Sequence, residues 1–429
     1  MLHFKLAKLF MVALFIPGEF ALDLGGLRLE IYRFILGISL ISGVLRLSKQ
    51  PGKMELADRL MLFVATIGFI SLLRNHGLGE GIEKGGIFLF EILGAYFLSR
   101  FGITNQVQLI KVYKILITMV LLFLIPTLIE MTTGYKVIHE LAKSVTGRIE
   151  LGPALYSEKY MRMGMTRSTS AFSHPILNGA ICVAAVPMAF YLLIRRFSVF
   201  SLFALVGVIA SVVSALSSAP LLVLMVNIAF GMYVKLKQII KSNIKYVMWF
   251  VIITAVVLQF SSNRGIIKLI IQTMTFNPET GTHRLLIIAN LEDDIMRHPI
   301  LGSGIGAYWS APGWMGQSID NFWWAIAFTY GIPYSVILAI TGLSCFIRIK
   351  VNDVPTKDDY LAYAIKACIL SLMIVGLTVH FFGKAHPLFF FTLGTSVFLF
   401  QQQNQQSTQR TRRPRTIKYN DGSNVADKQ

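Results

Sequence analysis

Residues 281–321 read GTHRLLIIANLEDDIMRHPILGSGIGAYWSAPGWMGQSIDN and form the longest polar interruption in a chain that otherwise consists of apolar runs. Cations, carboxylates, histidines and aromatic side chains are combined within this one segment. The apolar runs on either side have the length of membrane-spanning helices, so we interpret the rest of the chain as a scaffold for it.

An amphipathic helix is predicted within this segment, over residues 283–297. At 100° per residue, one face collects apolar side chains, namely Ile287, Ile288, Leu291 and Ile295. The opposite face carries Asn290, Asp293 and Arg297. Arg284 falls on the apolar face, where a cation needs an anion, and this makes it a functional candidate. Alternatively, its side chain extends to solvent or pairs with Glu292 or Asp294.

The composition indicates a membrane protein. Of the 429 residues, 54% are hydrophobic and only 14% are charged. This hydrophobic content exceeds what the core of one soluble domain needs. A net charge of +18 would indicate a nucleic-acid partner in a soluble protein. Here the basic residues fall in short segments between apolar runs, so we interpret them as topology signals and expect no nucleic-acid partner. The three cysteines, Cys182, Cys345 and Cys368, have neither a pairable nor a metal-binding spacing.

About twelve spans of roughly 20 residues are predicted, which makes the fold an all-α, polytopic membrane bundle. They lie near residues 4–22, 28–48, 58–75, 82–102, 110–132, 172–194, 198–216, 219–236, 245–261, 322–347, 360–381 and 386–402. The amino-terminal run lacks a cleavage site of the A-x-A type and is counted as the first span. Residues 1–402 are thus predicted to form one membrane domain, and the basic residues 403–429 a disordered tail.

Two long segments face outward if both termini lie in the cytoplasm, residues 133–171 and 262–321, and they are predicted to be partly helical. Their arginines are Arg148, Arg162 and Arg167 in the first, and Arg264, Arg284 and Arg297 in the second. Basic residues kept on the outer side indicate an anion there, and a lipid-linked diphosphate is the natural membrane candidate. The alternative is that they pair with nearby carboxylates, which are Glu150, Glu158, Glu292, Asp293 and Asp294.

A histidine–proline motif occurs in both segments, at His174-Pro175 and at His298-Pro299. Each predicts a turn that enters a helix or re-entrant segment, with a polar cap followed by proline at the first helical position. Free N–H groups at such a helix start would also suit a phosphate oxygen. The glycines of Gly302-x-Gly304-x-Gly306 lack a preceding strand and the spacing of a nucleotide loop, so they predict a tight turn.

Aromatic and polar side chains at the outer end supply further candidates. Trp323 and Trp324 fit an interfacial belt, whereas Trp309 and Trp314 lie further from a span and could stack on sugars. Ser217 and Ser218 permit close helix packing or contact a ligand. For the pair Asp320 and Asn321, a helix cap and a general base are the two interpretations.

The order of these motifs resembles the O-antigen polymerase and ligase superfamily, and looks most like its exopolysaccharide polymerase branch. The similarity runs over roughly residues 130–345. It rests on Arg167, Phe172, His174, Pro175 and Gly179, on Ser217, Ser218 and Pro220, on Arg284, His298, Pro299, Leu301, Gly302 and Gly304, on Asp320 and Asn321, and on Tyr330, Gly331, Ile332 and Pro333. Ligases of the family often carry a histidine before the asparagine of the second loop, where this chain has Asp320.

The resemblance implies a membrane-embedded, inverting glycosyltransferase that needs neither a metal nor a cofactor and works in a bacterial cytoplasmic membrane. Its substrate would be an undecaprenyl-diphosphate-linked oligosaccharide at the outer leaflet, with a flippase and a chain-length regulator as partners. In the family, outer-loop arginines engage the diphosphate, which carries over to Arg167 and Arg284. The acceptor hydroxyl would need modest base help, from Asp320, His298 or His283.

Other residues complete the candidate site, and other functions compete with this one. Arg162, His174 and Arg297 are further candidates for substrate binding, with the serines, tryptophans and Asn321 named above. A ligase of the same family is one alternative, and a transporter or flippase of lipid-linked glycans is another. Ionisable residues in or near spans favour the transporter, and these are Glu19, Glu91, Lys366 and His380.

Overall fold

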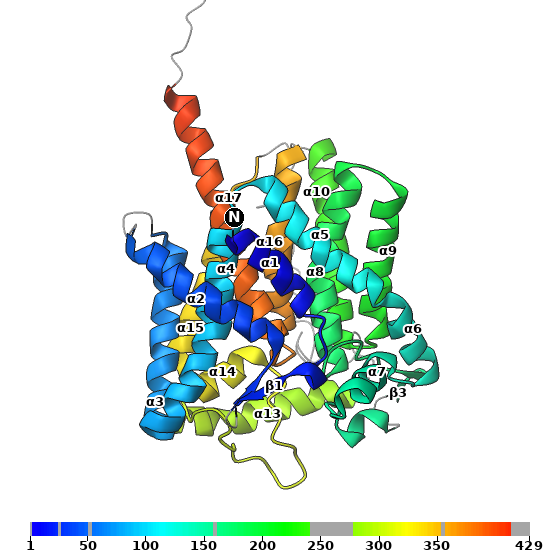
Figure 1. Ribbon diagram of the computed structural model, residues 1–429, viewed down its shortest axis with the longest axis vertical. Coiled ribbons are helices and arrows are strands. Elements are labelled where there is room, and N and C mark those ends of the chain that lie inside the picture. The colour runs from blue at the N-terminus through cyan, green and yellow to red at the C-terminus, as the bar shows by residue number, and fades with distance from the viewer. Residues whose placement is uncertain are drawn as a thin grey trace, which may run out of the picture.

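The described part of the chain is mostly helical, as Figure 1 shows. The computed structural model describes residues 2–24, 27–49, 54–157, 161–240, 278–352 and 357–412. The predicted span over residues 245–261 and the predicted site arginine Arg264 lie outside the described residues.

The helices of the first half are α1 (Leu2–Ala13), α2 (Ile31–Lys49), α3 (Leu56–Leu89), a π-helical turn (Phe90–Gly94), α4 (Ala95–Gly102), α5 (Gln106–Leu122), α6 (Leu124–Thr133) and α7 (Val137–Thr146). The helices that follow are α8 (Pro175–Arg195), α9 (Val199–Ser214), α10 (Ser218–Ile240), α13 (Pro278–Arg297), α14 (Phe322–Tyr330), α15 (Ile332–Arg348), α16 (Lys357–Val375) and α17 (Ala385–Arg412). Single turns of 3-10 helix occur at Gly18–Phe20 and Pro153–Tyr156.

Two short antiparallel hairpins are the sheet structure of the described residues. Strand β1 (Leu22–Leu24) pairs with β2 (Leu27–Leu29), so that Asp23 lies opposite Arg28. Strand β3 (Met161–Arg162) pairs with β4 (Met165–Thr166). The predicted all-α class is confirmed in this coarse sense.

Within the described residues, four helical segments are long and apolar enough to cross a bilayer, namely Ile31–Lys49, Leu56–Gly102, Gln106–Thr133 and Pro175–Arg195. Helix α9 adds an outward apolar face, because Phe200, Phe203 and Val206 recur at helical spacing and are at least half exposed. Large apolar side chains exposed in rows mark a surface that contacts lipid or protein. The chain is therefore a helical protein with the character of a membrane protein.

Several predicted spans have different boundaries because glycines break the helices. Gly77, with φ 74°, interrupts α3 between the predicted spans 58–75 and 82–102. The single span predicted over 322–347 is wrong, because Gly331 separates α14 from α15. Its φ of 99° suits glycine, and a Cβ atom there would lie 2.0 Å from the carbonyl oxygen of Ile300. At the other end of the chain, α17 continues past the predicted boundary at residue 402 to Arg412, through glutamines that favour helix.

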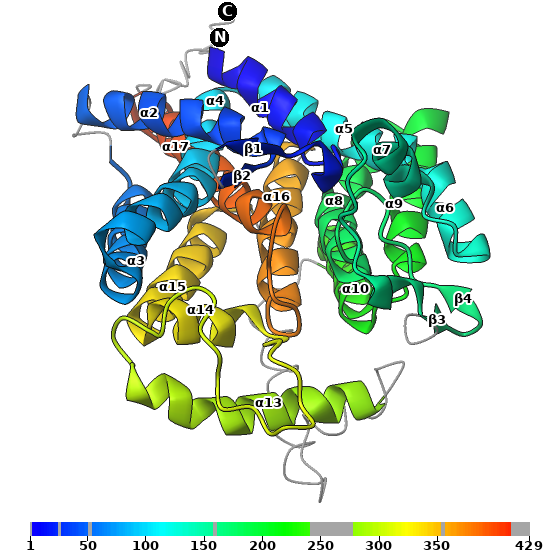
Figure 2. The ribbon, with the colours of Figure 1, turned by 60° about the horizontal axis from the view of Figure 1, so that its bottom comes forward.

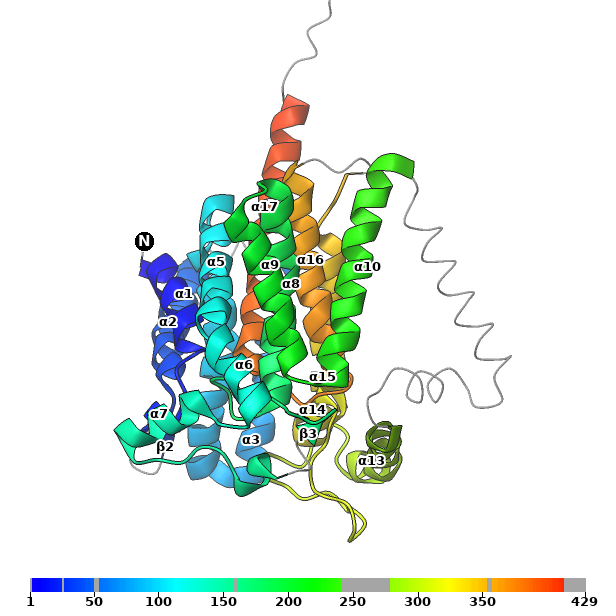
Figure 3. The same cartoon turned by 90° about the vertical axis from the view of Figure 1, so that its right-hand side faces the viewer.

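The helices form a bundle with two chemically distinct ends. In Figures 1 and 3, α7, β3 and α13 lie at the end opposite to the amino terminus and to the carboxyl-terminal end of α17. Figure 2 shows α13 lying across its end of the bundle. Basic side chains surround α17 near the other end, where Arg100 Nη1 donates to Gln401 at 3.1 Å and Arg348 Nη2 to Glu55 at 3.0 Å. The described parts of the two long segments that were predicted to face outward thus share one end.

Close helix packing relies on glycine at the centre of the bundle. A Cβ atom on Gly394 of α17 would lie 2.2 Å from the carbonyl oxygen of Tyr96, at the junction with α4. Small residues of this kind let helix backbones approach closely where hydrophobic driving force is weak. Glycine at this position therefore lets the backbones of α4 and α17 pack directly against each other.

Candidate functional site

Helix α13 buries the face that periodicity predicts. Ile287, Leu291 and Ile295 are at most 2% exposed. They pack in one cluster with Trp309 and Phe328, which come from the following loop and from α14. The predicted packed face of this helix is confirmed by this burial.

Arg284 lies on this packed face, one turn before Ile287, and its side chain is only 17% exposed. Its Nε lies 4.0 Å from a carboxylate oxygen of Asp320 and is buried without a hydrogen-bond partner among the described residues. Burial lowers the pKa of Arg284, and the Asp320 carboxylate acts against that shift. Because a guanidinium stays charged even so, Arg284 is a desolvated cation with hydrogen-bonding capacity to spare.

The alternative pairing of Arg284 with Glu292 or Asp294 is wrong. Asp294 instead accepts from Ser310 Oγ at 2.9 Å and pairs with Arg297 at 3.1 Å. Asp294 therefore fixes the loop that follows α13. The carboxylate that pairs with Arg284 is that of Asp320.

Asp320 is not a helix cap, contrary to one sequence-based interpretation. The cap of α14 is Asn321, whose side chain accepts from the Trp324 N–H at 3.2 Å and donates to the Leu377 carbonyl at 2.7 Å. A cap directly precedes the first helical residue, and α14 begins only at Phe322. Asp320 is thereby released to face Arg284, and it also accepts from Ser318 Oγ at 2.8 Å.

The loop that carries Arg167 is built around one buried carboxylate. Glu130 accepts from the N–H and hydroxyl of Thr169 at 2.7 Å each, from the N–H of Ser170 at 3.0 Å, and from Lys136 Nζ at 2.7 Å. Glu130 and Lys136 are each 1% exposed. With its charge paired and its acceptors used, this carboxylate holds residues 167–170 in one conformation. Sequence reasoning missed both residues, although paired opposite charges at the end of a span were a signal.

Arg167 itself is 9% exposed, and its Nε donates to the carbonyl of Ala215 at 3.4 Å. That carbonyl belongs to the turn between α9 and α10, which continues into Ser217 and Ser218. Ser217 is 5% exposed and its carbonyl accepts from Leu221. The structure thus places Arg167 against the turn that leads into the two serines of the candidate site.

His174 caps α8 with Pro175 at the first helical position, as predicted, and its Nδ1 accepts from the Ile176 N–H at 3.2 Å. Burial lowers the pKa of His174 to about 4; Arg167 adds to the effect and Asp320 opposes it. The ring is therefore neutral at physiological pH. His174 therefore lies within electrostatic reach of Arg167 from one long segment and of Asp320 from the other.

The stability of the protein should depend on this histidine at acidic pH. In the unfolded chain His174 binds a proton near its ordinary pKa of 6.5, but in the folded protein only near 4. Its contribution is therefore complete above about pH 6.5 and is lost as the pH falls toward 4. The variant His174→Asn keeps a capping side chain that does not titrate. When the pH is lowered from about 7 to about 4.5, we therefore expect its melting temperature to fall by less than that of the wild type.

Thermal unfolding of the purified protein followed by fluorescence checks this expectation. His298→Asn is the matched control, because the ring of His298 is exposed and meets solvent in both states. Equal acid sensitivity in wild type and His174→Asn would contradict the assignment of a buried neutral cap.

Residues 376–383 complete this end of the bundle, and sequence reasoning had placed His380 in a span. The N–H of Phe322 donates to the carbonyls of Gly376 at 2.8 Å and Val379 at 3.1 Å. The Phe382 ring lies 6.1 Å from the ring of His174 and 6.2 Å from that of His380. Burial lowers the pKa of His380 to about 4. The neighbouring His386 adds to this shift, and the charge of Asp320 acts against it. His380 is thus a neutral neighbour of the cluster formed by Arg284, Arg167, His174 and Asp320.

Several predicted site residues lie apart from this cluster. Arg297 and His298 are exposed and lie at the far end of α13, about 20 Å from Arg284 at the helical rise of 1.5 Å per residue. The motif His298-Pro299 was predicted to lead into a helix or re-entrant segment. In the structure, no helix begins at this motif. It forms a turn after α13, which Gly302, Gly304 and Gly306 continue at positive φ.

The tryptophans and Arg162 have separate environments. Trp309 is 3% exposed, and its indole N–H donates to the carbonyl of Gln317 at 3.1 Å, so it packs beneath α13. Trp314 is 69% exposed, and its ring lies 6.2 Å from that of His283. His283 directly precedes Arg284 in the sequence. Arg162 lies on β3, where its Nη1 donates to the carbonyl of Met161 at 3.1 Å. Of these side chains, Trp314 is the exposed one whose ring lies near His283, the residue before Arg284.

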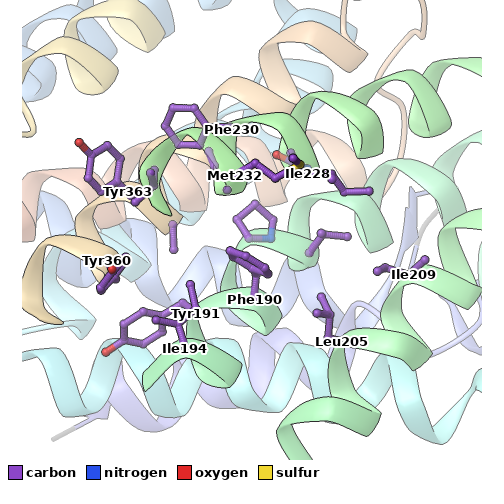
Figure 4. Close-up of a pocket in the computed structure, with 17 residues that line it drawn as sticks. Phe190, Tyr191, Ile194, Leu205, Ile209, Ile228, Phe230, Met232, Tyr360 and Tyr363 are labelled. Carbon is purple, nitrogen blue, oxygen red and sulfur yellow. The ribbon is translucent and has the colours of Figure 1, made fainter. Parts of the chain in front are cut away.

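An apolar pocket of about 140 Å³ lies elsewhere, between α8, α9, α10 and α16 (Figure 4). Its lining includes Phe190, Tyr191 and Phe230 and lacks charged side chains. A pocket of this kind suits an acyl chain better than chemistry at a diphosphate. In the part of the chain that the structure describes, no three His, Cys, Asp or Glu side chains are grouped to hold a metal ion.

Comparison with known proteins adds no family to these observations. No protein-family model matches the sequence, and no curated protein matches it.

Proposed function

We propose that this chain is a membrane-embedded glycosyltransferase that polymerises undecaprenyl-diphosphate-linked oligosaccharides into exopolysaccharide, capsule or O-antigen. The proposal includes about twelve spans, with both termini in the cytoplasm and α13 at the outer face of a bacterial cytoplasmic membrane. One observation carries it. At one end of an apolar bundle, Arg284, whose side chain is 17% exposed, pairs with Asp320 at 4.0 Å. The charges of Asp320 and of the buried Arg167 both act on the neutral ring of His174.

Arg284 is the central residue of the proposed donor site. A lipid-linked diphosphate is a membrane substrate whose anionic group sits at the bilayer surface, where α13 would lie. The guanidinium of Arg284 has a buried Nε without a hydrogen bond, so a phosphate oxygen would complete its partners. Arg167 supplies a second positive charge from a loop held rigid by Glu130.

The reaction would be a single displacement. The acceptor hydroxyl oxygen attacks the anomeric carbon while the bond from that carbon to the phosphate oxygen breaks, so its electron pair passes to the diphosphate. Preorganised guanidinium groups stabilise this charge in a site with little water. Asp320, 4.0 Å from Arg284, would take the hydroxyl proton, whereas His298 lies at the other end of α13. Because the diphosphate is already activated, positioning the acceptor supplies much of the rate.

A transporter or flippase is the second candidate, favoured by a buried charged network inside the bundle. Glu91 accepts from Arg33 Nε and from the Tyr32 hydroxyl at 2.9 Å each, and lies 3.3 Å from His386 Nδ1. These groups satisfy one another, which is typical of a structural network. A ligase is disfavoured because Asp320 stands where ligases often have histidine.

The proposal is tested by incubating the purified protein with a lipid-linked oligosaccharide and separating the products by size. We expect a ladder with steps of one repeat unit. Transfer of a glycan to an acceptor without a diphosphate would indicate a ligase. The absence of any longer product, from protein that binds the substrate, would contradict the polymerase.

A further inference from the structure

A cavity of about 390 Å³ lies beside the cluster just described, and it has no assigned role. It is lined by the second half of α3, by α14, by residues 305–306 and 380–383, and by Arg33, Glu91 and His386. Its volume is at the lower end of the range of about 300–1,000 Å³ for small-molecule sites. The cavity thus has room for a small ligand and opens at the same end of the bundle as α13.

The lining combines aromatic faces with polar groups. Phe88, Phe322, Phe381 and Phe382 supply aromatic rings, and His380 and Tyr330 supply polar ones. Carbohydrates present C–H faces that pack on aromatic rings and hydroxyl groups that need hydrogen bonds. The lining therefore fits a sugar ring better than an acyl chain, in contrast to the apolar pocket between α8 and α10.

The charges that line the cavity are already paired. Arg33 and Glu91 form an ion pair at 2.8 Å, and Lys84 pairs with Glu80 at 2.7 Å. A cavity whose charges are neutralised in this way favours a neutral polyhydroxyl ligand over an anion. This separates it chemically from the site around Arg284, which holds a cation with unused hydrogen-bonding capacity.

His380 supplies unused hydrogen-bonding capacity in the cavity. It lines the cavity, and its imidazole makes no hydrogen bond with the described residues. A neutral imidazole offers one donor and one acceptor, which matches a sugar hydroxyl. Because the Phe382 ring contacts the rings of both His174 and His380, a ligand in the cavity would lie next to the proposed donor site.

We propose that this cavity binds the sugar of the acceptor glycan that receives the transferred chain, with His380 as a hydrogen-bonding partner of one of its hydroxyl groups. The proposal rests on the proposed function. In this assignment the arginines bind the diphosphate of the donor. The aromatic cavity binds the sugar of the acceptor.

The test uses the full-length protein in nanodiscs and two kinds of probe. Saturation-transfer NMR is recorded with a panel of disaccharides that contain glucose, galactose, N-acetylglucosamine or glucuronate, and binding of undecaprenyl diphosphate is measured in parallel. Ile305→Trp fills the mouth of the cavity, because Ile305 lines it and is 38% exposed. Ile300→Trp is the matched control in the same loop, 66% exposed and outside the lining.

We expect at least one disaccharide to bind wild type and Ile300→Trp but not Ile305→Trp, with undecaprenyl diphosphate bound equally by all three. His380→Ala should weaken the disaccharide about fivefold, as expected of one hydrogen bond, and His298→Ala should not. If no disaccharide binds the wild type, or if Ile305→Trp binds as Ile300→Trp does, the acceptor assignment is overturned. Failure of undecaprenyl diphosphate to bind would instead overturn the proposed function, so the two failures are distinguishable.

Discussion

Replacing Arg284 with alanine is expected to reduce polymer formation by about a hundredfold to a thousandfold, the usual loss when one preorganised donor to a developing negative charge is removed. Arg284 is mostly buried beside Asp320, and its Nε is unsatisfied within the described residues. Its removal would leave the departing diphosphate without its principal counter-charge. Cells with this variant should accumulate single lipid-linked repeat units in the outer leaflet, as measured by extraction and gel separation, while the protein level stays normal.

Two further variants make this prediction specific. Arg297→Ala removes the same charge from the exposed far end of α13 and should leave polymer length unchanged. Arg284→Lys should fall between wild type and Arg284→Ala, because an ammonium keeps the charge but not the planar fork. Polymer of wild-type length from Arg284→Ala cells would rule out the role of this residue. Units stranded in the inner leaflet would indicate a flippase instead.

Removing the carboxylate of Glu130 is expected to destabilise the protein by about 3–5 kcal/mol, the cost of leaving a buried charge without its partner. In Glu130→Ala, the Lys136 ammonium would remain 1% exposed with no carboxylate, and Thr169 and Ser170 would lose their acceptors. The loop that carries Arg167 would lose its support at the same time. We therefore expect a lower melting temperature in detergent and reduced polymer formation.

The double variant Glu130→Ala/Lys136→Met separates the two contributions. It removes the stranded cation and should recover part of the stability, but not the hydrogen bonds that order residues 167–170. Glu140→Ala serves as control, because its partly exposed carboxylate pairs loosely with Lys143 at 3.6 Å. A Glu130→Ala melting temperature equal to that of Glu140→Ala would contradict a supporting role for the buried carboxylate.

Local pattern was enough to predict part of this arrangement. The buried face of α13 follows from helical periodicity, and the cap at His174 follows from its position before Pro175. The placement of both long segments at one end follows from the positions of the basic residues between spans. These features depend on residues that are close in sequence, where spacing alone carries the information.

The remaining features depend on contacts between distant segments. Thr169 and Ser170 meet Glu130 across some forty positions, and the pairing of Arg284 with Asp320 depends on how the loop after α13 folds back. The break at Gly331 reflects the approach of Ile300 from that same loop. Trp309 looked like an exposed sugar platform because its burial beneath α13 is decided by tertiary packing alone. No periodicity encodes such contacts, and only the pair of opposite charges at Glu130 and Lys136 left a signal in the sequence.

Binding of undecaprenyl diphosphate to the purified protein tests the central claim most directly, that arginines at the α13 end hold a lipid-linked diphosphate. Native mass spectrometry of wild type, Arg284→Ala and Arg297→Ala would give the three affinities with the same lipid. The account predicts that Arg284→Ala binds at least about tenfold more weakly than the wild type, since a charge-assisted hydrogen bond is lost, and that Arg297→Ala binds normally. Equal affinity of Arg284→Ala and wild type for undecaprenyl diphosphate would contradict it.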